Sequence, residues 1–171
     1  GTTTYDLQSN ASLQDRIIMH DDGTISAVWT MSQQLNTSFS DRGTGYNFFD
    51  GNSWGTLPLN RLESSRGGWP SIIAMGSGKE ASITHNTDNS HINMTHRSVT
   101  GVGSWTEQNI SSLDPSTGIY RDMIWNRSAV GGLNKETIHM IAVTASSNFG
   151  GLPFNGLDGA LVYYRSQDEG V

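Results

Sequence analysis

The stretch Arg16-Ile17-Ile18-Met19-His20-Asp21-Asp22-Gly23-Thr24-Ile25 recurs 55 residues later as Ser71-Ile72-Ile73-Ala74-Met75-Gly76-Ser77-Gly78-Lys79-Glu80. Each copy consists of a short apolar run, a polar turn that contains glycine, and a second run, which is the order of a β-hairpin. A looser third copy begins near Ile119. Repetition at this period is typical of proteins in which each unit is a small sheet that buries its faces against its neighbours.

We therefore expect an all-β fold: a partial β-propeller of about three four-stranded blades. The expected blades are residues 16–67, 68–118 and 119–171, preceded by an N-terminal strand segment at 1–15. Because closed propellers have about four to eight blades, we interpret the chain as the N-terminal part of a propeller with six to eight blades. The alternative is a complete three-hairpin sandwich. The expected strands are 16–20, 24–31, 38–49, 71–75, 80–85, 91–97, 121–125, 137–144 and 160–165, with an exposed linker at 109–117.

The composition supports strands and excludes several classes of function. Charged residues make up only 15% of the chain and there are 20 glycines, a balance that favours strands and tight turns over helices. The net charge of −6 is a poor match for the negatively charged phosphate backbone, so we do not expect a nucleic-acid partner. No apolar run has the length of a membrane span. Since the chain has no cysteine, it has neither disulfides nor cysteine metal sites.

One short motif points to a family of propellers. Ser166-Gln167-Asp168-Glu169-Gly170 resembles the start of the Asp-box, or BNR repeat, Ser-x-Asp-x-Gly-x-x-Trp, of sialidase-like propellers. In that family the box forms a hairpin turn between the third and fourth strands of a blade. The resemblance implies structural roles for Ser166, Asp168 and Gly170: the aspartate accepts hydrogen bonds from backbone amides, and the glycine adopts a conformation closed to other residues. Asp41-Arg42-Gly43, with Phe39 in the place of the serine, resembles a degenerate copy of the box.

The whole chain, including its opening Thr2 to Asn10, is similar to secreted propeller proteins of Bacteroidetes that leave the cell through the type IX secretion system. This resemblance rests on the general pattern of the sequence. It implies a secreted or cell-surface protein. The function we expect is a noncatalytic module that binds glycans or partner proteins, and its partners would be the rest of the propeller chain, a glycan or surface protein, and the secretion machinery.

A second resemblance suggests an enzyme as the alternative. Asp15-Arg16-Ile17-Ile18, followed by Gly23-Thr24-Ile25, is similar to the Arg-Ile-Pro strand of sialidases, with Ile18 in the place of the proline. In that family the arginine binds the carboxylate of the substrate, which suits the planar guanidinium group. An exo-sialidase-like glycosidase would then use Arg16, and Asp50 is the candidate for the acid. The structural alternative pairs Arg16 with Asp15 or Asp21. The noncatalytic function is the one we favour.

Two of the five tryptophans are candidates for contact with a ligand. Trp69 and Trp125 lie at an end of an expected inner strand, near the centre of the expected propeller, where they could stack on a sugar. Trp54 and Trp105 instead close the corners Gly51-Asn52-Ser53-Trp54 and Gly103-Ser104-Trp105, so we expect them to pack.

We expect no metal and no other cofactor. His85, Asp88, His91 and His96 fall within twelve residues, but they lack the close spacing of metal-binding histidines and fit solvated turns. Calcium is the alternative at loop aspartates, because it binds clustered loop oxygens. The aspartates concerned are Asp21, Asp22 and Asp114.

Overall fold

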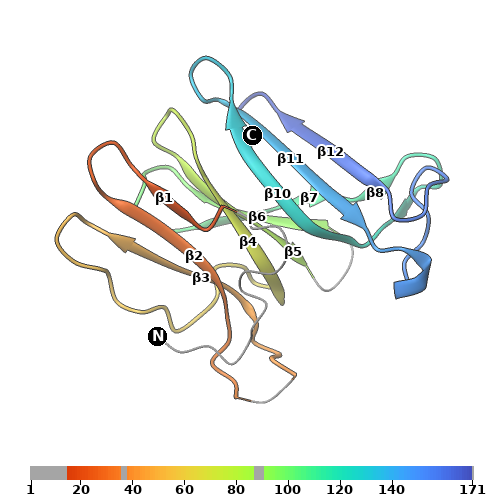
Figure 1. Cartoon of the computed structure of the whole chain (residues 1–171), viewed down its shortest axis with the longest axis horizontal. Coiled ribbons are helices and arrows are strands. Elements are labelled where there is room, and N and C mark those ends of the chain that lie inside the picture. Colours follow the sequence, from red (N-terminus) through yellow and green to blue (C-terminus); the bar gives the residue numbers. More distant parts are fainter. Residues whose placement is uncertain (1–14, 36–37, 87–90, 171) are drawn as a thin grey trace.

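The computed structural model describes residues 15–35, 38–86 and 91–170, which form strands in four antiparallel sheets (Figure 1). The expected all-β class is confirmed, since the described residues hold no helix beyond one 3-10 turn at Ser147–Phe149. No helix in the described part of the chain has the length and apolar character needed to cross a membrane. The strands are β1 (Ile17–Met19), β2 (Ile25–Met31), β3 (Gly43–Phe49), β4 (Gly67–Ala74), β5 (Glu80–Asn86), β6 (His91–Arg97), β7 (Thr106–Ser111), β8 (Leu113–Asp114), β9 (Ile119–Tyr120), β10 (Met123–Gly131), β11 (Thr137–Thr144) and β12 (Leu161–Ser166).

Three of the sheets are meanders whose strands pair in chain order. The first sheet is β1-β2-β3, the second is β4-β5-β6-β7 and the third is β10-β11-β12, while β8 and β9 form a small hairpin. Only the second sheet has the four strands expected of each unit. The segment that follows β3 carries Gly51, Gly55 and Pro58, which do not suit a pleated strand, and it crosses to the second sheet as a loop.

The hairpins of the first two sheets have the same register. Ile17 pairs with Ala27 in the first sheet, and the residues 55 positions later, Ile72 and Ser82, pair in the second. The repeat read from the sequence is therefore a repeat of backbone pairing as well. In the third sheet the two strands of the hairpin, β10 and β11, are each one residue longer than β4 and β5 in the second sheet.

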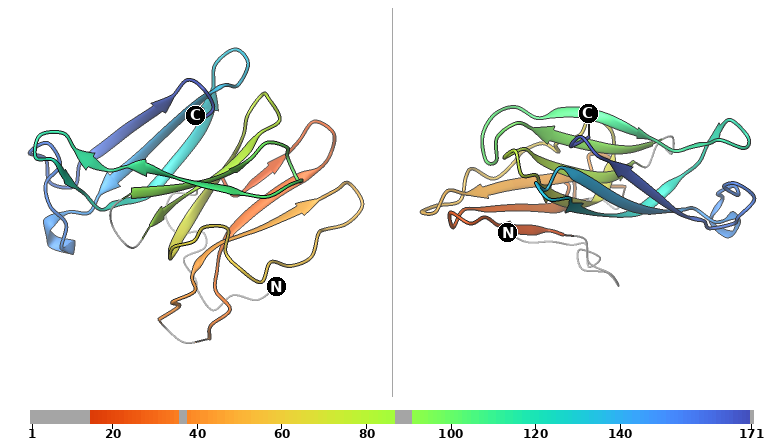
Figure 2. Two further views of the ribbon diagram at one scale, coloured as in Figure 1. Left: turned by 180° about the vertical axis from the view of Figure 1, so that it is seen from behind. Right: turned by 90° about the horizontal axis from the view of Figure 1, so that it is seen from above.

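The second sheet lies between the other two, as Figure 2 shows from behind. The first strands of the sheets lie next to one another: the Ile72 amide donates to the Asp15 carbonyl at 2.8 Å, and the hydroxyls of Ser71 in β4 and Ser128 in β10 are 2.8 Å apart. A shared apolar core fills the space between the second and third sheets. Its buried members are Ile73, Met75, Ala81, Ile83, Ile92, Met94, Met123, Ile138, Met140 and Ala142.

A polar network joins the first sheet to the second. The buried carboxylate of Glu80 in β5 accepts hydrogen bonds from Ser26 in β2, Tyr46 in β3 and Arg97 in β6, and it also forms an ion pair with Arg97. The Arg97 guanidinium lies 4.4 Å from the centroid of the Trp105 ring. Trp105 therefore packs at this junction, as expected.

Three expected element boundaries are wrong. The strand expected at 38–49 begins only at Gly43, because residues 38–42 belong to the loop before it. The linker expected at 109–117 overlaps β7, which pairs with β6 and packs Ile110 against the core. The strand expected at 121–125 is instead β10, which continues to Gly131 across a bulge after Ile124.

Candidate binding site at the crossing end

Each sheet has two ends, which we name by their connections. The hairpin end carries the tight turns β1–β2, β4–β5 and β10–β11, which point the same way in Figure 1. The crossing end is the opposite one, where residues 50–66, after starting at the hairpin end of β3, lead into β4 at Gly67. Four of the candidate residues, Asp41, Gly43, Trp69 and Trp125, lie at the crossing end.

Trp69 and Trp125 occupy equivalent places in β4 and β10. Each tryptophan lies in a β-bulge, where the strand pairing shifts. The bulge in β4 lies between Gly68 and Ser71, and the bulge in β10 lies between Ile124 and Arg127. Both have a φ of 53°, which is uncommon for a residue other than glycine and is held only where the surroundings determine it. The structure thus brings the two expected ligand-binding tryptophans to matching, strained positions on neighbouring strands.

The two indole rings differ in what covers them. The Trp69 ring is stacked on His85 with centroids 4.9 Å apart, and the Arg42 guanidinium lies 4.9 Å from its centroid. Trp125 is 48% exposed, and its backbone amide donates to Nδ1 of His85 at 3.4 Å. Trp125 therefore has ring surface for a ligand, whereas Trp69 is packed within the protein.

His85 is buried at the centre of this group. Burial, together with the positive charges of Arg42, Arg127 and Arg66, lowers the pKa of His85 to about 3. The imidazole is therefore neutral at physiological pH and can accept the Trp125 amide proton.

Three arginines are fixed around His85 by backbone carbonyls. Arg42 donates from Nε to the Gly67 carbonyl at 2.8 Å, and Arg66 donates from Nε to Phe39 at 3.0 Å. Arg127 donates from Nη1 to the carbonyl of Trp125 at 3.0 Å. These contacts hold the guanidinium groups in place next to the tryptophans. We call Arg42, Arg66, Trp69, His85, Trp125 and Arg127 the arginine–tryptophan cluster.

Arg16 lies beside this cluster and does not meet Asp50. Burial and the charge of Arg127 lower the pKa of Arg16 to about 10. The Arg16 carbonyl accepts the amide of Val28, in the middle of β2, while Asp50 follows the end of β3. The register separates the two residues by roughly 13 Å along the strands, in addition to the width of the sheet.

Asp50 forms a turn at the hairpin end. Its carboxylate accepts the amides of Asn52 and Ser53, each at 2.8 Å. These amides lower the pKa of Asp50, so the group is ionised at neutral pH and is not suited to donate a proton. The neighbouring Trp54 packs against Phe49 with ring centroids 5.6 Å apart and is 50% exposed.

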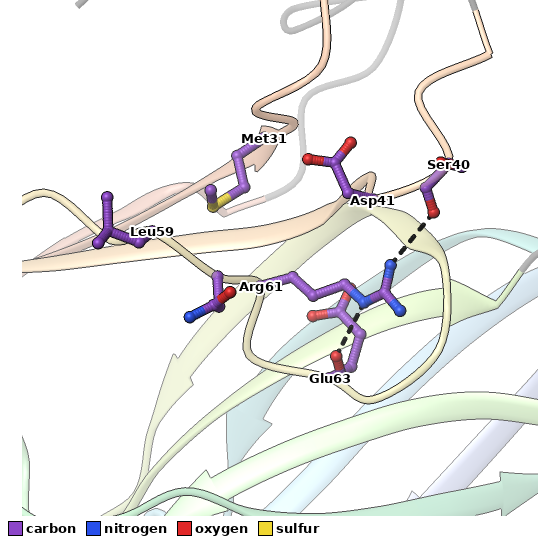
Figure 3. A pocket seen from close by; sticks show the side chains of 7 residues that line it. Met31, Ser40, Asp41, Leu59, Arg61 and Glu63 are labelled. Carbon is purple, nitrogen blue, oxygen red and sulfur yellow. Dashed lines mark hydrogen bonds between the residues drawn. The ribbon is translucent and has the colours of Figure 1, made fainter.

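A cavity of about 440 Å³ opens at the crossing end, beside the first sheet (Figure 3). Glu63 in its wall is buried, and burial raises the pKa of this carboxyl group. Glu63 also accepts the amide of Thr44 at 3.0 Å, and Arg61 donates to the Glu63 carbonyl at 3.1 Å. The wall is built from Met31, Ser40, Asp41, Leu59, Asn60, Arg61 and Glu63.

A second cavity, of about 380 Å³, lies beside the start of β6. Side chains with hydroxyl, amide, imidazole and carboxylate groups surround it. The buried Asn93 links these groups, since it accepts from Ser65 at 3.1 Å and donates to Glu107 and Asn109. Such a lining offers donors and acceptors of the kind that sugar hydroxyls use. The cavity is lined by Ser64, Ser65, Asn86, His91, Glu107, Gln108 and Asn109.

The Asp-box-like residues lie in two different settings. Ser166 forms a turn after β12, where its hydroxyl accepts the Gly170 amide at 2.8 Å and donates to Asp168 at 2.5 Å. The serine is thus an acceptor for a backbone amide in this turn. Gly170 has a φ of 82°, which suits glycine.

Asp41 lies in the loop before β3, and Gly43 is the first residue of β3. Neither residue lies in a turn that follows a third strand, where the Asp-box is expected. Asp41 accepts hydrogen bonds from the hydroxyl of Ser32 and the amide of Gln33. The Asp41 carboxylate therefore closes the β2–β3 loop rather than a hairpin of the Asp-box kind.

The aspartates considered for calcium serve other contacts. Asp22 accepts the amide and hydroxyl of Thr24, and Asp114 forms a buried ion pair with Arg121 at 3.0 Å. Asp21 stands exposed in the same turn as Asp22. Within the ranges that the structure describes, no three His, Asp or Glu residues are grouped as a metal site. Asp88 lies outside the described residues.

The sequence did not indicate the grouping of Arg42, Arg66 and Arg127 around His85. These residues are far apart in the chain, and the strands that carry them meet only when the sheets pack. The adjacent Gly67-Gly68 pair before Trp69 is the one local sign of a close approach, since Arg42 atoms lie 3.3 Å from where a Cβ of Gly68 would stand. No protein-family model and no curated protein matches this chain.

Proposed function

We propose that the three large sheets are consecutive blades of a β-propeller with six to eight blades. Three observations support this arrangement: the shared hairpin register, the adjacent first strands β1, β4 and β10, and the bulge that recurs at Trp69 and Trp125. A repeated sheet that packs on its neighbours through both faces is the unit of a propeller.

We further propose that this propeller is a noncatalytic module that binds glycans or partner proteins at the crossing end. The observation that carries the proposal is the exposed ring of Trp125, held at a strained backbone position next to the Arg127 guanidinium group. Backbone strain of this kind concentrates at functional sites, and exposed tryptophans dominate the energetics of many binding surfaces.

The resemblance to secreted propellers of Bacteroidetes extends this proposal to location. A secreted or cell-surface module carried by the type IX system would meet glycans and surface proteins outside the cell. Secretion machinery would then be a transient partner.

Trp54 provides a matched control for a binding test, because it has nearly the same exposure as Trp125 but lies at the hairpin end. Trp125→Ala is expected to weaken binding to oligosaccharides by about tenfold or more, because one aromatic anchor is lost. Trp54→Ala should leave the affinity unchanged. Isothermal titration calorimetry with a panel of neutral and carboxylate-bearing oligosaccharides measures this. Equal losses in both variants, or no binding to any member of the panel, would contradict glycan binding at this site.

A sialidase-like glycoside hydrolase is the second candidate, and the position of Arg16 beside Arg127 favours it. Two neighbouring guanidinium groups suit a substrate carboxylate. Turnover of a fluorogenic sialoside that disappears in Arg16→Ala would support the enzyme. Absence of turnover in the unmodified protein argues against it.

A further inference from the structure

The cavity beside the start of β6 has a polar wall that the Trp125 surface does not use. Its volume of about 380 Å³ falls within the range of small-molecule sites, roughly 300–1,000 Å³. Sites of this size are mostly lined by apolar side chains, whereas this one is lined by serine, asparagine, glutamine, histidine and glutamate. Such a wall suits a ligand that itself carries several hydroxyl groups.

The cavity lies on the face of the second sheet that is turned away from the third. In β6, Asn93 stands between Ile92 and Met94, which are both buried in the core shared with the third sheet. Because neighbouring residues of a strand point to opposite faces, Asn93 points away from that core. Asn109 is the partner of Asn93 in β7 and shares its face. The second sheet therefore separates this cavity from Trp125, which belongs to the third sheet.

The buried amide of Asn93 fixes two residues of the wall. Asn93 is 0% exposed, and its Nδ2 donates to Oε1 of Glu107 at 2.5 Å and to Oδ1 of Asn109 at 3.0 Å. Its Oδ1 accepts the hydroxyl of Ser65 at 3.1 Å. The carboxylate and the amide of the wall are thus held in place before a ligand arrives, which lowers the cost of ordering them on binding.

The same network continues to the other side of the cavity. The buried Asn86 donates from Nδ2 to the hydroxyl of Ser65 at 2.9 Å, and this nitrogen lies 3.0 Å from Nε2 of His91. A chain of side-chain hydrogen bonds therefore runs from His91 through Ser65 and Asn93 to β7. Connected networks of this kind hold their members in one arrangement.

Glu107 and Asn109 keep hydrogen-bonding capacity for a ligand. Glu107 accepts Asn93 on one carboxylate oxygen and the Ser64 amide, at 2.9 Å, on the other, and each oxygen has a further lone pair. Asn109 is exposed and uses only its oxygen, since its Nδ2 donates to no group in the part of the chain that the structure describes. The wall thus places a strong acceptor beside a free donor.

This pair matches two neighbouring hydroxyls of a sugar. A hydroxyl group donates one hydrogen bond and accepts others, so one hydroxyl can donate to Glu107 while the next accepts from Asn109. The described wall has one carboxylate and neither arginine nor lysine. A negatively charged sugar would therefore be repelled, and a neutral one would not.

We propose that this cavity is a binding site for neighbouring hydroxyls of a neutral saccharide, with Glu107 as the acceptor and Asn109 as the donor. The site is separate from the surface at Trp125 and does not rest on the function proposed for that surface.

The first test locates binding by nuclear magnetic resonance. The protein is titrated with the methyl glycosides of glucose, galactose and mannose, and ¹H–¹⁵N correlation spectra are recorded. At least one of the three is expected to shift the side-chain amide signals of Asn109 and Asn93 and the backbone amide signal of Ser64. Glucuronate, which carries a carboxylate, is expected to leave these signals unchanged.

The second test uses variants that keep the buried network. Asn109→Asp retains the oxygen that accepts from Asn93 but loses the donor, so it should weaken binding by about fivefold or more. Ser64→Tyr keeps the backbone contact with Glu107 and fills the cavity with its ring, so it should abolish binding. Asn52→Asp is the matched control: Asn52 is exposed in the turn after β3, and the same change there should leave the affinity unaltered.

Three results would overturn the inference. They are the absence of shifts at Ser64 and Asn109 with all three glycosides, unchanged affinity in both cavity variants, and binding of glucosamine without binding of any neutral glycoside, which would mark a site for an ammonium group. The Trp125 indole signal reports the other surface in the same spectra. Shifts confined to that signal would leave the Trp125 proposal standing and refute this one, so the two failures are distinguishable.

Discussion

At the scale of single residues, Trp69 and Trp125 show how one backbone conformation can serve two purposes. Both have the same positive φ at the same bulge. Trp69 directs its ring onto His85, where it helps to bury the imidazole, and Trp125 directs its ring outward. The bulge therefore re-aims side chains at the edge where the cavities open.

The buried His85 predicts a pH dependence of stability. Its pKa is about 3 in the folded protein against an ordinary 6.5, so below pH 6.5 the unfolded chain takes up a proton that the folded chain refuses. The stabilising preference for the neutral ring is present above pH 6.5 and is lost as the pH falls toward 3.

His85→Gln removes this titration, so between pH 6.5 and 4.5 its free energy of unfolding should fall less steeply than that of the unmodified protein. The difference in slope approaches about 1.4 kcal/mol per pH unit. Urea denaturation at a series of pH values measures it. His96→Gln should flatten the slope less, because His96 is only half-buried. Parallel slopes for His85→Gln and the unmodified protein would refute the assignment.

At the scale of elements, the tight turns of neighbouring sheets touch through their backbones. The Gly76 amide at the β4–β5 turn donates to the Lys135 carbonyl of the β10–β11 turn at 3.2 Å. The turn after β12 reaches the same place, where the Lys79 ammonium donates to the Glu169 carbonyl at 2.7 Å and the Ser77 hydroxyl donates to the Glu169 carboxylate. The hairpin end thus locks the second and third sheets together.

This close approach predicts that Gly76 does not tolerate a side chain. A Cβ at Gly76 would stand 1.8 Å from the Asn134 carbonyl oxygen, and backbone cannot give way as a side chain can. Gly76→Ala is expected to lower the free energy of unfolding by about 1–3 kcal/mol. Gly68→Ala is the control, with an expected loss below about 1 kcal/mol, since the nearest atom to its Cβ is Nε of the Arg42 side chain, at 3.3 Å, and not a backbone atom. Chemical denaturation of both variants measures the difference, and equal stabilities would disprove the contact.

At the scale of the whole molecule, the two sheet junctions differ in chemistry. The second and third sheets share an apolar core, whereas the first and second are joined by the buried network around Glu80 and Arg97. A buried network requires every partner to be satisfied, so it specifies one arrangement of the two sheets. The outer faces of the first and third sheets expose apolar side chains such as Ile17 and Leu161.

Part of the fold and less of the site could be predicted from local patterns. The glycine turns and apolar runs near Ile17 and Ile72 located the hairpins correctly, because turn chemistry and strand periodicity act over a few residues. Residues 109–111 were misread as part of a linker, since their role in the fourth strand of a sheet depends on the partner β6. The sequence singled out Trp69 and Trp125 as candidates because of their places at the ends of expected strands. It did not predict the bulges next to them or their positive φ values.

Short-range chemistry in the chain was therefore enough to establish the all-β class and the hairpin repeat. The strand count of each sheet, the strained tryptophan positions, the arginines around His85 and the uncovered outer faces were decided only when the sheets packed. The physical reason is that these features join residues dozens of positions apart, such as Trp69 with Thr30 and Trp125 with His85. Only the packing of whole sheets determines which of those residues meet.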